Sequence, residues 1–265
     1  MSEFAIKNDV AGQAKCRSQP PNSGGKILVH HLLAEFMGTA LMIIFGVGVH
    51  CSEVLKGTKY RGSGHIFAIT TWGFGITIAL FIFGDVCINP AMVLAQCILG
   101  NLSWAVFIPY SVAEVLGGVI GAMIVWVMYA DHFKASEEEV SPITIRNLFS
   151  TAPAVRNLPR NFFVEFFDTF IFISGILAIS EVKTPGIVPI GVGLLVWAIG
   201  MGLGGPTGFA MNLARDMGPR IAHALLPIKN KANSDWQYGI IVPGIAPFVG
   251  AACAALFMHA FFGIG

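Results

Sequence analysis

The amino-acid sequence predicts an all-α membrane protein, with six transmembrane helices and two re-entrant half-helices in an inverted repeat. Three observations support this fold class: a membrane-protein composition, six stretches long and apolar enough to cross a bilayer, and two short segments that each follow an Asn-x-Ala tripeptide. Of the 265 residues, 55% are hydrophobic and 12% are charged. A soluble domain has about 25% charged residues.

The same composition excludes several classes of function. The formal net charge is +1, which argues against a nucleic-acid partner. The five cysteines are scattered and show no His/Cys ligand spacing, so we expect no metal site and no cofactor. Thirty-one glycines fit helices that pack closely within a membrane.

Six stretches meet the length requirement for a spanning helix, which is about 20 mostly apolar residues. They are residues 27–51, 64–84, 104–130, 161–180, 186–205 and 237–262. Residues 1–26 are polar and lack the apolar run of a signal peptide. We therefore expect a disordered polar tail over 1–26 and a membrane domain over 27–265.

Two more apolar segments are too short to span. They are PAMVLAQCILG after Asn89 and LARDMGPRIAH after Asn212, each 11 residues long. As helices they would measure about 16 Å, half of the hydrocarbon thickness. Non-helical backbone at membrane depth is tolerated only where it is buried or lines a watery cavity. Two re-entrant half-helices therefore predict a pore or a binding site at the midplane.

An internal repeat relates the two segments. AEFMGTALMII begins at Ala34 and VEFFDTFIFIS at Val164, and EVLGGVIGA in the third span is echoed by APFVGAA in the sixth. We place the first repeat at about 27–130, a loop at 131–160 and the second repeat at about 161–262. Because each half has an odd number of spans, the second half must enter the membrane with opposite topology, as in proteins with a midplane pathway.

The two tripeptides have a common chemistry. Asn89 suits a helix N-cap and Pro90 suits the first helical position. Asn212 can cap the second half-helix in the same way, with Leu213 in place of proline. Two half-helix N-termini that meet at mid-bilayer place about half a positive charge each there, which opposes cations while the asparagine amides donate to a passing oxygen. We therefore expect Asn89, Asn212 and Leu213 to form the pore constriction.

The quoted motifs also carry a family resemblance. AEFMGTALMIIFGVG, CINPAM, VEFF and TGFAMNLARDMGPR resemble the major intrinsic protein family, the aquaporins and aquaglyceroporins, over about residues 28–262. Asp216 and Gly218-Pro219 match the glycerol-conducting branch. Within that branch the chain is similar to the lactic-acid facilitators of lactobacilli, including the leucine of the second motif. The resemblance implies an aquaporin-like fold, a channel domain over 27–265 and a homotetramer with one pore in each subunit.

Arg215 is the charged residue nearest the second tripeptide. A charge at membrane depth is costly, so Arg215 is either buried in an ion pair or is a lumen-facing donor that orients solutes and repels cations. The resemblance favours the second role and implies a selectivity filter of Arg215, Phe209, Gly200 and Trp72. A glycine at 200 leaves space that a histidine fills in water-selective relatives.

The stretch before Asn89 departs from the family pattern. Trp72 lies 17 residues before Asn89, about three fewer than the family spacing, and a rigid count back from Asn89 would place Ile69 in the filter. Cys87 stands where the family has a histidine. Trp72 is our assignment, with Ile69 as the alternative.

Several acids lie inside predicted helices. Glu35 and Glu165 occupy equivalent places in the two repeats, so we expect both to support the re-entrant loops by accepting hydrogen bonds from backbone N–H groups; a proton relay is the alternative. Glu114 lies in the third span. Asp216 is expected to pair with Arg220 four residues later, or to anchor the start of the half-helix.

Six spans place both termini on one side of the membrane. That side carries five Lys and Arg residues and the other carries eleven, a count that would put the termini outside. We expect cytoplasmic termini nevertheless, because Arg215 and its neighbours serve the pore and the 131–160 loop also carries Asp131 and Glu137–Glu139.

These observations predict a passive channel in the plasma membrane for small neutral solutes. Protonated lactic acid is the first candidate, with glycerol and water as further ones, because an unpaired anion would cross a low-dielectric pore at a cost of several kcal/mol. The alternative is a proton-coupled secondary transporter for a small organic acid or polyol. A conspicuous carboxylate pair at the midplane is lacking, which disfavours it. The sequence shows no Ser/His, paired-Asp or metal-histidine arrangement, so we expect no enzyme.

Overall fold

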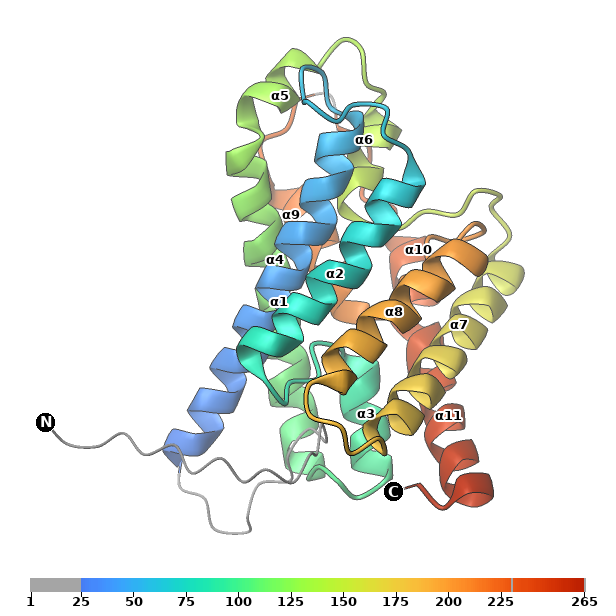
Figure 1. The fold of residues 1–265 in the computed structure, drawn as a ribbon. Coiled ribbons are helices and arrows are strands. Elements are labelled where there is room, and N and C mark those ends of the chain that lie inside the picture. Colours follow the sequence, from blue (N-terminus) through green and yellow to red (C-terminus); the bar gives the residue numbers. More distant parts are fainter. Residues whose placement is uncertain (1–24, 230, 265) are drawn as a thin grey trace, which may run out of the picture.

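The computed structural model describes residues 25–229 and 231–264, which form a bundle of tilted helices with no strand within these ranges (Figure 1). The six predicted spans correspond to α1 (Gly25–Val54), α2 (His65–Phe83), α4 (Phe107–Met128), α7 (Leu158–Ser180), α8 (Ile187–Gly202) and a final span, with a 3₁₀ turn (Trp104–Val106) before α4. The final span consists of α10 (Trp236–Gly239), a π-helical segment η2 (Ile240–Ile245) and α11 (Ala246–Phe262). Most of the predicted tail, residues 1–24, lies outside the described residues.

Five of these spans are long and apolar enough to cross a membrane, and α8, with 16 residues, is shorter. At 1.5 Å per residue α8 is about 24 Å long. The predicted span over 186–205 ends early because the chain leaves the helix after Gly202. The N–H of Gly208 then bonds to the carbonyl of Gly204 within the turn that leads to the second half-helix.

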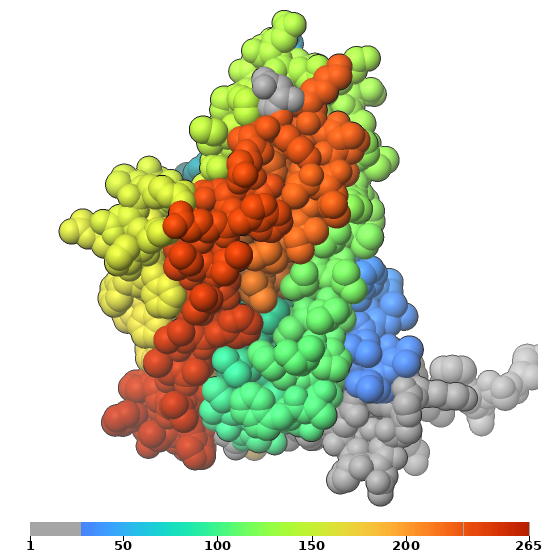
Figure 2. Space-filling view, turned by 180° about the vertical axis from the view of Figure 1, so that it is seen from behind, coloured from blue at the N-terminus to red at the C-terminus, as the bar shows by residue number. Residues whose placement is uncertain are grey.

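The two half-helices are α3 (Pro90–Ile98) and α9 (Leu213–Leu225). Each one packs against the other half of the chain: α3 lies against α11, and α9 lies against α4. Figure 2 shows α11 in red, running between α7 in yellow and the teal and green segments of α3 and α4. The half-helices therefore interlock the two repeats.

Close packing of the first and third spans occurs in both halves. A Cβ on Gly117 of α4 would overlap the carbonyl oxygen of Phe36 on α1, and a Cβ on Gly250 of α11 would overlap the carbonyl oxygen of Phe166 on α7. Phe36 and Phe166 hold equivalent places in the repeat. The sequence similarity between the third and sixth spans therefore reflects two matching close contacts between backbones. Each contact requires a glycine, because any side chain would overlap the neighbouring carbonyl.

The predicted loop over 131–160 contains two short helices that the sequence analysis did not anticipate, α5 (Ala130–Ala135) and α6 (Pro142–Phe149). The side chain of Ser141 caps α6 by accepting a hydrogen bond from the N–H of Thr144 at 3.1 Å. Glu139, between the helices, pairs with Lys56 and Arg61 of the α1–α2 connection. These contacts hold the 131–160 loop and the α1–α2 connection together at one end of the bundle.

Candidate functional site

The tips of the two half-helices meet inside the bundle. Asn89 and Asn212 both have extended backbones and cap their helices: the Asn89 side chain accepts from the N–H of Ala91, and Asn212 accepts from the N–H groups of Ala214 and Arg215. Each asparagine also donates across to the other tip. Asn89 Nδ2 lies 2.9 Å from the carbonyl oxygen of Met211 and Asn212 Nδ2 lies 2.7 Å from that of Ile88. Each amide NH₂ retains a second proton for another acceptor.

The carbonyls that receive these bonds belong to residues with an unusual backbone. Ile88 has φ 44° and Met211 has φ 50°, in the left-handed region that few residues other than glycine adopt. Strain of this kind persists where surrounding contacts enforce it. Here two buried carboxylates, Glu35 and Glu165, enforce it.

Glu35 and Glu165 act on the two loops in the same way. The oxygens of Glu35 accept from the N–H groups of Cys87 and Ile88, each at 2.8 Å. The oxygens of Glu165 accept from the N–H groups of Ala210 and Met211, each at 2.9 Å. Each carboxylate therefore holds the backbone just before one asparagine.

Glu114 of α4 adds a contact that the repeat does not duplicate. Its Oε1 accepts from the N–H of Asn89 at 2.9 Å. Pro247 takes the equivalent place in α11 and cannot accept through a side chain.

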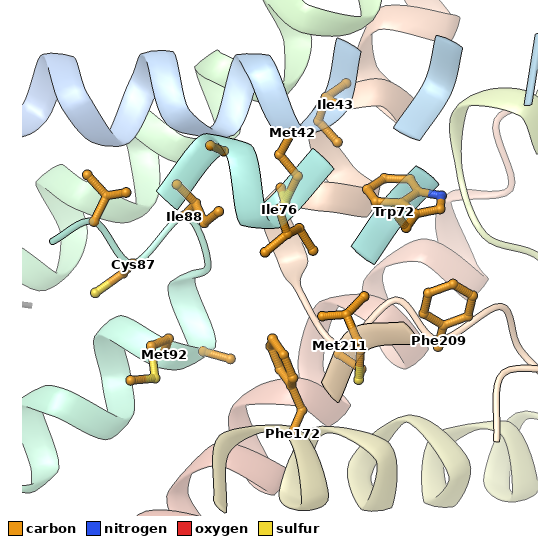
Figure 3. Close-up of a cluster of buried hydrophobic side chains, with 14 of the residues drawn as sticks. Met42, Ile43, Trp72, Ile76, Cys87, Ile88, Met92, Phe172, Phe209 and Met211 are labelled. Carbon is orange, nitrogen blue, oxygen red and sulfur yellow. The ribbon is translucent and has the colours of Figure 1, made fainter. Parts of the chain in front are cut away.

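A cavity of about 310 Å³ runs past both asparagines. Its wall near the tips is largely apolar, and Figure 3 shows the side chains that surround the open space: Met42, Ile76, Ile88, Met92, Phe172 and Met211. The polar groups in this wall include Asn89, Asn212 and Arg215. A solute in the cavity would meet hydrocarbon on most sides and hydrogen-bond donors on one.

Trp72, Phe209 and Arg215 all line this cavity. The guanidinium carbon of Arg215 lies 4.1 Å from the centre of the Trp72 ring, a cation–π contact. Ile69, the alternative from the rigid count, is not among the described lining residues. The shortened stretch before Asn89 therefore does not keep Trp72 out of the cavity.

Two expected site residues, Gly200 and Leu213, do not line the cavity within the described part of the chain. A Cβ on Gly200 would come within 2.6 Å of Ile69 Cγ2 and 3.1 Å of Phe209 Cζ, so the space beside Gly200 is occupied by those side chains. Leu213 is half-buried with its Cδ1 toward Gly244 of η2. Leu213 is the first residue of α9, and its side chain points toward η2. It therefore contacts the final span and not the lumen.

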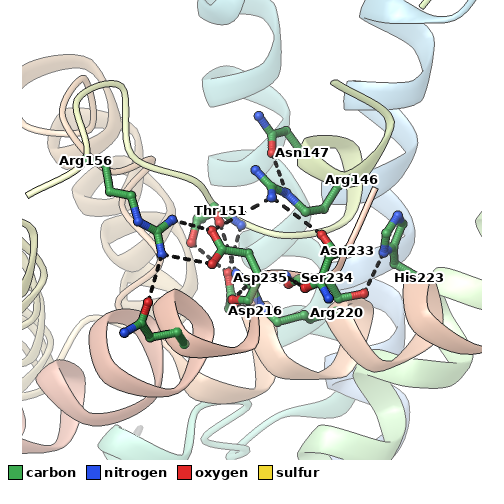
Figure 4. A network of polar contacts seen from close by, with 11 residues as sticks. Arg146, Asn147, Thr151, Arg156, Asp216, Arg220, His223, Asn233, Ser234 and Asp235 are labelled. Carbon is green, nitrogen blue, oxygen red and sulfur yellow. Dashed lines mark hydrogen bonds and ion pairs between the residues drawn. The ribbon is translucent and has the colours of Figure 1, made fainter. Parts of the chain in front are cut away.

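A polar network holds α9 in place behind the cavity (Figure 4). The predicted pairing is confirmed: Nε of buried Arg220 lies 2.7 Å from Oδ1 of Asp216, four residues earlier. The other Asp216 oxygen accepts from the backbone and hydroxyl of Thr151. Arg220 also donates to the carbonyls of Thr151 and Ser234. The network thus joins α9 to the segments on either side of it.

Arg156 extends the network toward the surface. Its two terminal nitrogens bond to the two carboxylate oxygens of Asp235, at 2.7 and 3.0 Å. This contact lowers the pKa of Asp235 below its ordinary value. No group of three or more His, Cys, Asp or Glu side chains that could hold a metal ion occurs in the ranges that the structure covers.

The family model described as "Major intrinsic protein" matches residues 25–258. The chain belongs to the major intrinsic protein family. Relatives in Lactiplantibacillus plantarum include "Glycerol uptake facilitator protein 4", 93% identical over 90% of this chain and all of the relative, and "D/L-lactic acid transporter", 88% identical over 89% of this chain and all of the relative.

A solved structure of the same fold is the aquaglyceroporin from Plasmodium falciparum, with a TM-score of 0.77, 22% identity, and coverage of 88% of this chain and 96% of that one. The all-helical, aquaporin-like fold expected from the sequence is therefore confirmed. The chain is accordingly a multi-pass membrane protein of the major intrinsic protein family.

Proposed function

We propose that this chain is a passive channel for small neutral solutes, with protonated lactic acid as the main solute and glycerol and water as further ones. The observation that carries the proposal is the filter: Arg215 supplies donors on one side of the cavity, and Trp72 and Phe209 supply an apolar wall. A carbon backbone with a hydroxyl and a neutral carboxyl fits such a lining. The names of the relatives, glycerol facilitators and a lactic-acid transporter, support the same solute class.

In this proposal the asparagine tips form the constriction. Asn89 and Asn212 offer amide protons to a passing oxygen, and the half-helix dipoles and Arg215 oppose cations. Glu35 and Glu165 support the loops. Gly200, which has no side chain, leaves room for the ring of Phe209. No catalytic step and no cofactor enter the mechanism.

We further propose a homotetramer in the plasma membrane with cytoplasmic termini. Large apolar side chains cover the outside of the bundle, including Phe74 and Ile66 on α2, each about two-thirds exposed, which suits lipid or neighbouring subunits. The excess of basic residues on the side opposite the termini includes Arg215 and Arg220, both buried within the fold, so they do not report orientation.

Proteoliposome swelling tests the function. Vesicles with the wild-type protein should take up glycerol, and lactic acid at low pH, faster than empty vesicles, and should shrink faster in an impermeant osmolyte. Phe209→Ala should alter the ratio among the solutes, whereas Phe163→Ala, an exposed residue on α7, should not. Permeabilities equal to those of empty vesicles would reject the channel. Accumulation of glycerol above its outside concentration under an imposed proton gradient would instead indicate a coupled transporter.

A further inference from the structure

The indole of Trp72 lies in a socket built by α1. A Cβ on Gly46 would overlap the six-membered ring of Trp72, so the ring lies directly against the α1 backbone. One turn later on the same face, Nε2 of His50 lies 3.1 Å from the indole Nε1. Trp72 is 3% exposed. Gly46 thus makes room for the ring and His50 binds its one polar atom.

This contact defines the protonation of His50. An indole N–H can only donate, so Nε2 of His50 must be the acceptor and must carry no proton. In the neutral ring the proton then sits on Nδ1. Nδ1 faces Glu53, whose Oε2 lies 3.9 Å away.

Glu53 connects the ring to the surface. Its Oε1 lies 3.1 Å from Nδ1 of His65, a residue that is 84% exposed at the start of α2. Its Oε2 is buried and has no hydrogen-bond partner in the described ranges, which leaves it available to the Nδ1 proton of His50. A row of polar groups therefore leads from the exposed end of α2 to the filter, with its longest step, 3.9 Å, between Glu53 and His50.

We propose that His50 is a positioning residue for the filter, which fixes the indole of Trp72 against Arg215 while its Nε2 is unprotonated. The inference rests on the proposed channel function. The groups that face His50 are Glu53 on α1, His65 and Trp72 on α2, and Arg215 on α9. Burial of the ring and the charges of Arg215 and His65 oppose a second proton on His50, and Glu53 favours it.

A second proton on the His50 ring would break its hydrogen bond with Trp72. Protonated imidazole has a donor at both nitrogens, so two N–H groups would face each other and the indole would lose its acceptor. An isolated histidine takes up such a proton near pH 6.5. The filter geometry then depends on pH, apart from any ionisation of the solute.

Glycerol permeability tests this, because glycerol carries no charge across the range. Four proteins are compared in proteoliposomes: wild type, His50→Leu, His50→Gln and His30→Leu. Leucine removes the acceptor, and glutamine keeps an acceptor oxygen that does not titrate. His30 is an exposed residue on the same helix, so His30→Leu is the matched control.

The glycerol-to-water permeability ratio should change about fivefold in His50→Leu, the equivalent of one hydrogen bond. His50→Gln and His30→Leu should keep the wild-type ratio at about pH 7.5, above the ordinary histidine titration. Between about pH 7.5 and about pH 4.5 the ratio should shift in the wild type and in His30→Leu, and stay constant in His50→Gln. Equal ratios and equal pH profiles in all four proteins would overturn the inference.

A second measurement does not depend on transport. In ¹⁵N-labelled protein the indole N–H signal of Trp72, assigned by its loss in Trp72→Phe, should move in His50→Leu and should titrate in the wild type but not in His50→Gln. An indole signal that is the same in wild type and His50→Leu overturns the inference even when the channel conducts. A wild-type protein that fails to conduct rejects the proposed function, and the indole signal then decides the His50 contact separately.

Discussion

The side chain of Arg215, on the half-helix of the second repeat, lies over the ring of Trp72, from the second span of the first repeat, with 4.1 Å between the guanidinium carbon and the ring centre. The filter is therefore assembled across the two halves. Trp72 comes from the first half, whereas Arg215 and Phe209 come from the second. Substitutions at the filter in either half should therefore affect the permeation of the same solutes.

Replacing Arg215 should remove cation exclusion. In Arg215→Ala we expect proton leakage to rise about tenfold, since a loss of about 1.4 kcal/mol of repulsion corresponds to a factor of ten. Arg215→Lys keeps the charge but not the planar fork that stacks on Trp72. It should therefore keep exclusion while its glycerol permeability changes. A pH-sensitive dye inside proteoliposomes measures the leak, and a leak as low in the alanine variant as in wild type would contradict the role given to Arg215.

A methyl group at position 200 should alter the filter by displacing the side chain of Phe209. In Gly200→Ala the added Cβ would lie 2.6 Å from Ile69 Cγ2 and 3.1 Å from Phe209 Cζ, so those side chains must shift. Overpacking of this kind costs about 1–3 kcal/mol. We expect a lower thermal stability and a reduced glycerol permeability. Gly202→Ala is the control, since no described atom outside the local helix lies within 4 Å of its added Cβ, and it should behave as wild type. Equal swelling rates in both variants would show that position 200 does not position Phe209.

The two buried glutamates should contribute similarly to stability. Glu35→Gln and Glu165→Gln each replace one accepting oxygen with an NH₂ group that faces a backbone N–H. A buried backbone N–H that loses its acceptor costs about 1–3 kcal/mol, so each variant should unfold at a lower temperature in detergent. Glu181→Gln, at an exposed helix end, should leave the unfolding temperature unchanged. A wild-type melting curve for either buried variant would mean that its carboxylate does not hold the loop.

Lactic acid flux should rise steeply on acidification. Its carboxyl group titrates near pH 3.9, like that of aspartate, so the neutral fraction increases by about 250-fold from pH 7 to pH 4.5. The neutral acid is the conducted form in our proposal, because its anion would lose its hydration in the pore. Radiolabelled uptake into proteoliposomes measures the flux, and His50→Gln removes the contribution that we assign to the filter. A flux that is flat over this range would indicate transport of the anion.

Much of the fold could be predicted from the sequence because its signals are local. Apolar length located the spans, and the asparagine caps located the starts of α3 and α9 at Pro90 and Leu213. The short helices α5 and α6 were missed because they are amphipathic segments at the end of the bundle, too short to show in an apolar-run count. The end of α8 was placed three residues too late, since Gly204 and Gly205 do not interrupt an apolar pattern.

The site was less accessible to sequence reasoning. The repeat pointed to Asn89 and Asn212, but it could not show that each amide bonds to the carbonyl just before the other asparagine. The contact between Trp72 and His50 depends on how α1 and α2 cross. The only signal in the sequence was that Gly46 lies four residues before His50, on the same helix face. That spacing can be interpreted only once the indole of Trp72 is known to pack against Gly46.

The exchange of half-helices between the repeats has a consequence for biosynthesis. α3 emerges from the ribosome with the first half of the protein, yet much of the surface that shields it belongs to α11, which is made after the other described spans. The carbonyl of Ile88 likewise has to await Asn212 for its bond. The nascent chain thus carries an incomplete channel in the bilayer until α11 has been made, and a protein truncated before α11 would leave part of α3 exposed to lipid and to quality control.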